Sequence, residues 1–297
     1  MFKQKERQKD LRLKHAFTVD VEDWYHGIAD EKTRASAERR LDYGLGRLLD
    51  ILAEYEVKGT FYWLGPAAVE HPYLVRQVAD AGHEIGCHGW LHELVYTMSP
   101  QRFREETRKA CDAIANLTGK PIISYRAPYF SITRKSLWAL EILIELGFQY
   151  DSSIFPVRNW RYGIPNFPRQ PQQIDTPSGS IYELPVSVRP IFNYNLPVSG
   201  GSYFRLYPYS ITQNNFLALE QQGLPVVFYI HPWELDPDHP PVPLNWKERL
   251  THYVNFHSTT PKLRRLLAEF SFAPLGDVFK NSQTRVANNH PSPSLTN

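Results

Sequence analysis

Short apolar runs alternate with helix-like segments along most of this 297-residue chain. Buried strands are expected where the runs are compact, at residues 15–21, 60–64, 83–87, 122–125, 148–151 and 224–230. Helices are expected where apolar residues recur every three or four positions, at residues 41–55, 72–81, 100–117, 131–146, 209–222, 246–256 and 262–270. Ser99 is a plausible N-cap and Gly119 a plausible stop for the longest helix. Repeated strand-then-helix units predict an α/β fold with parallel strands, either a (β/α) barrel or an open doubly wound sheet.

Three segments depart from this alternation. Residues 1–14 carry six basic side chains against two acidic ones, which predicts a solvated basic leader. Residues 156–208 are rich in Pro, Gly, Tyr and Asn, with strand-like pieces such as 181–188, and are expected as an insertion of loops and strands over one face. Residues 280–297 have the composition of a disordered tail, so the folded domain should span 15–279.

Composition excludes several classes of protein. With 42% hydrophobic and 22% charged residues, the chain is expected to be a soluble globular protein. A net charge of +2 does not favour a general nucleic-acid binder. Two cysteines, Cys87 and Cys111, cannot make a disulfide-rich scaffold or a zinc ribbon. We see no transmembrane run and no secretory signal, so a cytoplasmic location is expected, with weak peripheral membrane attraction through the leader as an alternative.

Two segments contain side chains that could bind a metal. His88 and His92 are four residues apart just after a short strand, and on one helical turn both imidazoles could reach one divalent ion. Asp20, Glu22 and Asp23 crowd the end of the first strand, where strand ends of a parallel barrel face the active site. One carboxylate with two histidines suits hydrolytic chemistry at zinc, iron, cobalt or manganese.

Two further segments place single polar residues at strand ends. Arg126 follows the strand at 122–125 and could pair with a catalytic carboxylate and fix its orientation. His231 follows the most strand-like run of the chain and could transfer a proton near neutral pH. Each feature alone could be structural, but four of them at strand ends favour an active site.

In this order the four segments resemble the polysaccharide deacetylases of the NodB-homology type, family-four carbohydrate esterases. The carrying residues are the acidic cluster 20–23, the His88/His92 pair, Arg126-Ala127-Pro128-Tyr129, and 228–231. The runs at 150–156, 199–205 and 228–233 look like an exosortase-associated, exopolysaccharide-locus subgroup with an extra C-terminal segment. This resemblance implies a distorted (β/α) barrel of seven or eight strands and removal of N-acetyl groups from an N-acetylated polysaccharide or oligosaccharide.

The resemblance also implies roles for individual residues. Asp20, aligned by Arg126, would be the general base, and His231 the acid that protonates the leaving amine. Asp23, His88 and His92 would hold the metal, expected to be zinc, with iron, cobalt and manganese as alternatives.

The family's adjacent aspartates are separated here, so either Asp23 or Glu22 could be the carboxylate ligand; we favour Asp23. The family's fourth motif also departs from its usual form, leaving Asp151 or Trp160 to orient His231. Tyr129, whose backbone N–H could stabilise the oxyanion, and Trp233 are expected to contact substrate.

The sequence is also compatible with two other functions. One is a related amidohydrolase on the same barrel, acting on a small cyclic amide or ureide. The other is an inactive glycan-binding homologue, although a binder would not require a base, a metal and an acid together. The sugar, its linkage and the oligomeric state are not determined by the sequence.

Overall fold

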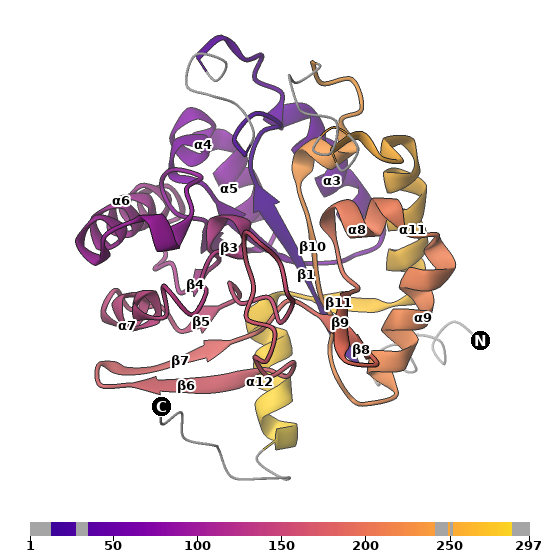
Figure 1. The fold of residues 1–297 in the computed structure, drawn as a ribbon. Helices are drawn as coiled ribbons and strands as arrows, with labels where there is room; N and C mark the ends of the chain where they lie inside the picture. The colour runs from indigo at the N-terminus through magenta and orange to yellow at the C-terminus, as the bar shows by residue number, and fades with distance from the viewer. Residues whose placement is uncertain (1–12, 28–34, 241–248, 250–251, 287–297) are drawn as a thin grey trace.

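The computed structural model describes residues 13–27, 35–240, 249 and 252–286 of the chain. A single curled sheet forms its centre (Figure 1), with the strand order β10-β1-β2-β3-β4-β5-β7-β6. Strand β11 also pairs with β1, at the start of that strand. All neighbours are parallel except the β6–β7 edge pair. The sheet curls into an incomplete barrel, which confirms the predicted α/β barrel class.

The first half of the chain builds this sheet by strand-and-helix units. The strands are β1 (Lys14–Val21), β2 (Thr60–Trp63), β3 (Glu84–Cys87), β4 (Ser124–Tyr125) and β5 (Tyr150–Asp151). The helices are α3 (Leu41–Glu54), α4 (Gly65–Glu70), α5 (Pro72–Asp80), α6 (Pro100–Thr118) and α7 (Trp138–Glu145). Every residue of β1 after Lys14 is buried, as expected for a parallel strand covered on both faces.

Helix α6 confirms the predicted caps, whereas α7 begins later than predicted. Ser99 Oγ accepts a hydrogen bond from Arg102 N at 3.2 Å, and Gly119 ends the helix with a φ of 67°. Helix α7 starts at Trp138 and not at Ser131, because Ser131 and Ser136 bond to nearby backbone groups and form turns instead.

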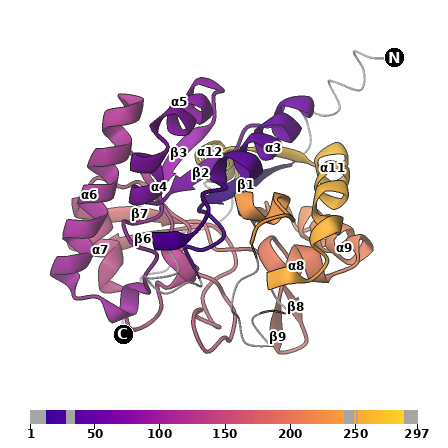
Figure 2. The same cartoon turned by 90° about the horizontal axis from the view of Figure 1, so that it is seen from above.

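The second half of the chain adds two β-hairpins and further helices. Strands β6 (Gln172–Thr176) and β7 (Gly179–Glu183) extend the main sheet, whereas β8 (Val188–Ile191) and β9 (Tyr194–Pro197) form a separate hairpin. The sheet therefore includes part of the segment that we expected as a covering insertion. Three helices lie on the opposite side of the molecule from helices α4, α5, α6 and α7 (Figure 2): α8 (Gly201–Leu206), α9 (Tyr209–Glu220) and α11 (Thr259–Glu269).

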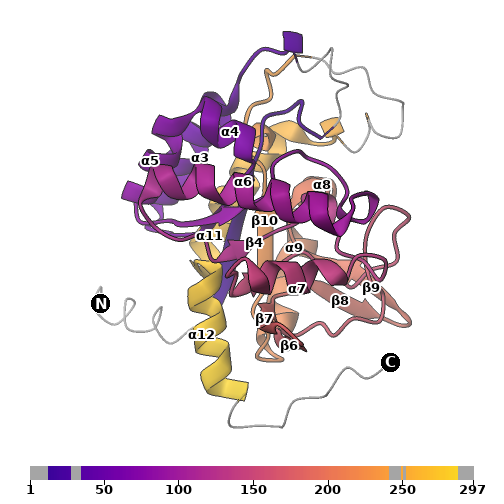
Figure 3. The same ribbon diagram turned by 90° about the vertical axis from the view of Figure 1, so that its left-hand side faces the viewer.

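The C-terminal strands complete the sheet beside β1. Strand β10 (Val227–Ile230) pairs with β1, the short η3 turn (Pro232–Leu235) follows it, and β11 (Ser271–Ala273) pairs with the start of β1. Helix α12 (Leu275–Val286) is the yellow helix at the lower end of the fold in Figure 3. Its first backbone N–H groups donate to Thr60 Oγ1 and Glu84 Oε2.

Helix α12 extends into the segment 280–297 predicted as a tail, and residues 287–297 lie outside the described residues. The leader residues 1–12 and much of the helix predicted at 246–256 also lie outside them. Within the described ranges, no helix is both long and apolar enough to cross a bilayer. The cytoplasmic location stays a prediction.

Candidate active site

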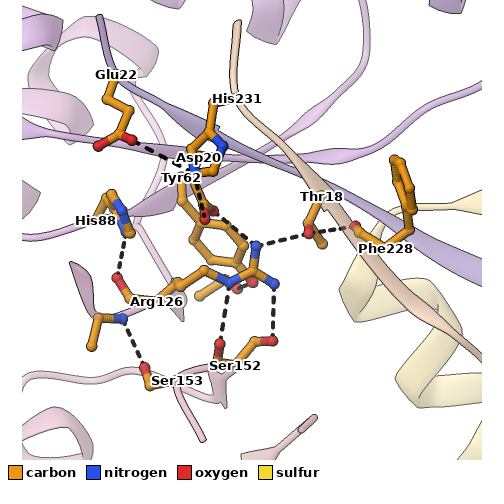
Figure 4. Close-up of polar contacts among 12 residues, drawn as sticks. Thr18, Asp20, Glu22, Tyr62, His88, Arg126, Ser152, Ser153, Phe228 and His231 are labelled. Carbon is orange, nitrogen blue, oxygen red and sulfur yellow. Dashed lines mark hydrogen bonds and ion pairs between the residues drawn. The ribbon is translucent and has the colours of Figure 1, made fainter. Parts of the chain in front are cut away.

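The strand order brings the four predicted segments to one edge of the sheet. Strands β10, β1, β2, β3 and β4 are consecutive neighbours, and all run parallel. The carboxyl ends of β1, β3, β4 and β10 therefore lie together, and these ends carry Asp20, His88, Arg126 and His231 (Figure 4). The predicted convergence of the four segments is confirmed by their positions.

Glu22, His88 and His92 form a cluster with metal-ligand chemistry. One donor atom from each lies within 4.8 Å of the other two. His88 Nδ1 is 2.7 Å from the backbone oxygen of Arg126, so Nδ1 carries the proton and Nε2 is left free. Burial, the largest effect on His88, lowers its pKa to about 4, which keeps the imidazole in the neutral form that binds metals.

The cluster fits a cation better than it fits internal hydrogen bonding. His92 Nε2 lies 2.8 Å from Glu22 Oε2, yet this oxygen and His92 Nδ1 have no partner of ordinary hydrogen-bond geometry among the described residues. Two ligand atoms that each lie about 2.1 Å from one ion are roughly 3 Å apart. Burial alone would favour a neutral Glu22, but the surrounding imidazoles lower its pKa and keep the carboxylate charged.

Asp23, favoured from the sequence as the metal ligand, points elsewhere. Its Oδ2 accepts hydrogen bonds from the backbone N–H groups of Arg40 at 2.8 Å and Leu41 at 3.1 Å, and its Oδ1 accepts one from Trp24 N at 2.8 Å. The chain turns directly after β1, so strand alternation no longer decides which side chain faces the site. Asp23 therefore caps the N-terminus of α3, and Glu22 takes the place beside the histidines.

Asp20 and Arg126 form a buried ion pair below the cluster. Arg126 Nη1 donates to Asp20 Oδ1 at 2.8 Å and to Thr18 Oγ1 at 2.8 Å. Its other nitrogens donate to the backbone oxygen of Ser152 at 3.1 Å and to Ser152 Oγ at 3.0 Å (Figure 4). These contacts fix the guanidinium and hold Asp20 in one orientation, with Oδ2 turned toward His231 Nε2 at 3.9 Å.

His231 is oriented by Glu234, three residues later in η3. Its Nδ1 lies 2.8 Å from Glu234 Oε1, and Arg205 Nε donates to Glu234 Oε2 at 2.6 Å. Burial opposes a charge on His231, but the hydrogen bond to Glu234 and the negative charge of Glu22 raise its pKa to about 9. Neither Glu234 nor Arg205 is among the site residues expected from the sequence. The His-x-x-Glu spacing at the start of a helical turn, a capping box in the structure, was the available signal.

Neither Asp151 nor Trp160, the two residues expected to orient His231, does so. The Asp151 carboxylate is fully buried and accepts hydrogen bonds from Ser153 Oγ at 2.5 Å and Ser153 N at 3.3 Å. It interacts with Glu183, its register partner on β7, and not with His231. Trp160 is 84% exposed. Glu234 occupies His231 Nδ1 instead.

Tyr129 and Trp233 line the cluster from two sides. The Tyr129 ring meets His92 edge-on with centroids 4.3 Å apart, and its backbone has a φ of 55°, an uncommon conformation for tyrosine. The Trp233 ring stacks on His231 at 5.3 Å, and its Nε1 donates to Glu22 Oε1 at 3.5 Å. Their contact with substrate stays a prediction.

Separate parts of this chain match known protein families. Residues 44–150 match the family model described as polysaccharide deacetylase, and residues 152–280 match a domain of unknown function, DUF3473. A peptidoglycan deacetylase from Helicobacter pylori is 27% identical over 150 residues, which cover 49% of this chain and 50% of that protein. The chain thus spans about half the length of this curated relative.

Two solved structures establish the fold. A Mycobacterium smegmatis protein assigned to the polysaccharide deacetylases superposes with a TM-score of 0.65 at 20% identity, covering 97% of this chain and 96% of that one. Puue allantoinase superposes with a TM-score of 0.60 at 15% identity, covering 94% of this chain and 91% of that one. Residues 44–150 therefore form a polysaccharide deacetylase domain of the NodB type, and residues 152–280 carry the DUF3473 segment.

Proposed function

We propose that this protein is a metal-dependent hydrolase that removes N-acetyl groups from amino sugars of a bacterial exopolysaccharide or its precursor. One observation carries the proposal. A buried carboxylate and two imidazoles with metal-ligand spacing lie beside an arginine-bound aspartate and a histidine held by a second carboxylate. This combination offers a cation site, a base and an acid in one place.

Glu22, His88 and His92 would hold the cation, which we propose to be zinc, with iron, cobalt or manganese as alternatives. A divalent ion bound there would polarise the acetamide carbonyl and make water a stronger nucleophile at neutral pH. The chain's own residues supply the ligands and the two proton-transfer groups.

Asp20 is placed to accept the proton of the attacking water. Arg126 occupies Oδ1, so Oδ2 is the oxygen that remains for proton transfer. Because Arg126 is itself fixed by Thr18 and Ser152, the base does not reorient during the reaction.

His231 is placed to protonate the leaving nitrogen. Glu234 accepts the proton on Nδ1, so the proton available for transfer is on Nε2, which faces Asp20 and Glu22. Transfer of this proton as the C–N bond breaks releases a free amine and acetic acid. The proton that Asp20 takes from water equals the one that His231 gives to nitrogen, so the protein gains and loses one proton in the reaction.

The substrate class is supported by the sequence segments that resemble the exopolysaccharide-locus subgroup and by the DUF3473 match. The Helicobacter pylori relative is named a peptidoglycan deacetylase, so peptidoglycan is the principal competing glycan. Both are N-acetylated polysaccharides, and the catalytic roles above apply to either.

Metal analysis followed by acetate release tests the proposal. Purified protein is expected to bind about one divalent ion per chain and to release acetate from N-acetylated oligosaccharides, and chelation should abolish that release. His88→Ala should lose both metal and activity. The panel includes exopolysaccharide repeat units, peptidoglycan fragments and cyclic ureides. Hydrolysis of ureides alone would replace the proposal with the amidohydrolase function, and glycan binding without hydrolysis would indicate an inactive homologue.

A further inference from the structure

Trp160 is a large apolar side chain exposed on an ordered loop. Its side chain is 84% exposed, although exposed indoles are unfavourable in water. The loop that carries it is closed by a hydrogen bond from Ile164 N to Phe155 O at 2.9 Å. Asn195 Nδ2 donates to the backbone oxygen of Pro156 at 2.6 Å, tying the loop to β9. The indole is thus presented outward by a fixed backbone.

A chain of ring contacts connects Trp160 to the candidate active site. The Arg161 guanidinium carbon lies 4.7 Å from the Trp160 ring centroid and 4.9 Å from that of Tyr129. Tyr129 in turn contacts the His92 ring at 4.3 Å. The Arg161 backbone is held by Tyr96, whose hydroxyl donates to its carbonyl oxygen at 2.9 Å. Trp160 therefore lies a few ring widths from a candidate metal ligand.

We propose that Trp160 is a binding platform for a pyranose ring of the substrate, next to the sugar that loses its acetyl group. The C–H face of a sugar ring packs well on an indole, and Arg161 covers one face of the indole, leaving the other for the ligand. The Arg161 guanidinium beside it can donate hydrogen bonds to hydroxyl or carboxylate oxygens of the sugar. This inference rests on the proposed function and specifies its substrate as an oligosaccharide of at least two units.

The platform predicts a dependence on substrate length. Trp160→Ala should lower kcat/KM for N-acetylated tetrasaccharides by about tenfold, mainly through KM, and leave kcat/KM for the monosaccharide within about twofold. Trp160→Phe keeps an aromatic ring and should lose less kcat/KM for the tetrasaccharides than Trp160→Ala. The matched control is Tyr43→Ala on α3, another exposed aromatic ring covered by an arginine, Arg40 at 4.6 Å. The control is expected to behave like the wild type at every length.

Failure of the inference is distinguishable from failure of the proposed function. An equal loss for all substrate lengths, or no loss with the tetrasaccharide, overturns the platform while deacetylation stands. If the wild type releases no acetate from any sugar, calorimetric binding of a glucosamine tetrasaccharide decides. Binding that Trp160→Ala weakens by about tenfold supports the platform, and binding that is absent or unchanged overturns it.

Discussion

The adjacent residues Glu22 and Asp23 should give opposite results when each loses its charge. Glu22 lies in the candidate metal cluster, whereas the Asp23 carboxylate caps α3 through three backbone hydrogen bonds. We expect Glu22→Gln to weaken metal binding by at least about a hundredfold, because even outer-shell changes cost roughly 10- to 100-fold. We expect Asp23→Ala to keep the metal and to lose stability.

The stability loss for Asp23→Ala follows from its three bonds, of 2.8, 2.8 and 3.1 Å. A buried N-cap and charge-assisted hydrogen bonds of this kind together contribute about 3 kcal/mol, because removing them leaves buried N–H groups without an acceptor. For a domain of this size, that loss lowers Tm by about 6 °C. Glu22→Gln should lose less stability than Asp23→Ala relative to the metal-free wild type, because glutamine keeps the size of the side chain and its amide oxygen can still accept the Trp233 hydrogen bond.

Metal content by mass spectrometry and thermal unfolding in a chelator measure both effects on the same samples. Glu22→Asp is a useful control, because it keeps the charge and shortens the reach of the ligand. The assignment is refuted if Asp23→Ala loses the metal and unfolds normally while Glu22→Gln retains it.

Three further predictions concern the acid His231, the residue Glu234 that orients it, and the buried carboxyl pair of Asp151 and Glu183. His231→Ala should lower kcat by at least about a hundredfold with the metal retained, and wild-type rates would remove His231 from the mechanism. Glu234→Gln should lower kcat about tenfold with little change in KM, because His231 loses its oriented partner; a change confined to KM would contradict this. Burial and the adjacent Asp151 raise the pKa of Glu183 well above its ordinary value. The native state therefore keeps this proton to a higher pH than the unfolded chain, and stability falls as the pH rises above about 4.3. Glu183→Gln should lose less stability than the wild type between pH 5 and pH 8 in urea unfolding, and parallel losses would refute the reasoning.

The sequence predicts the location of the site because parallel topology is recognisable from strand-and-helix alternation. Once β1, β3, β4 and β10 are read as parallel strands, the polar residues at their ends must share an edge. The same reasoning predicts that Arg126 pairs with a carboxylate, and the family resemblance implies Asp20; the two side chains lie 2.8 Å apart.

Other features depend on local backbone geometry that strand-and-helix alternation does not specify. Whether Glu22 or Asp23 faces the histidines depends on how the chain turns after Val21. The role of Glu234 depends on the η3 turn, and its counterion Arg205 comes from α8, in a segment where composition indicated only loops and strands. The predicted start of α7 at Ser131 is wrong because serine side chains there hydrogen-bond to nearby backbone groups and compete with the helix.

The position of β1 between β2 and β10 has a consequence for protein synthesis. Val19 pairs with Phe61 on one side and with Ile230 on the other, so the first strand is completed by a partner made more than two hundred residues later. A nascent chain released before residue 227 has Asp20 and Glu22 but lacks the strand that delivers His231. The acid and base of the site meet only when nearly the whole described domain has left the ribosome.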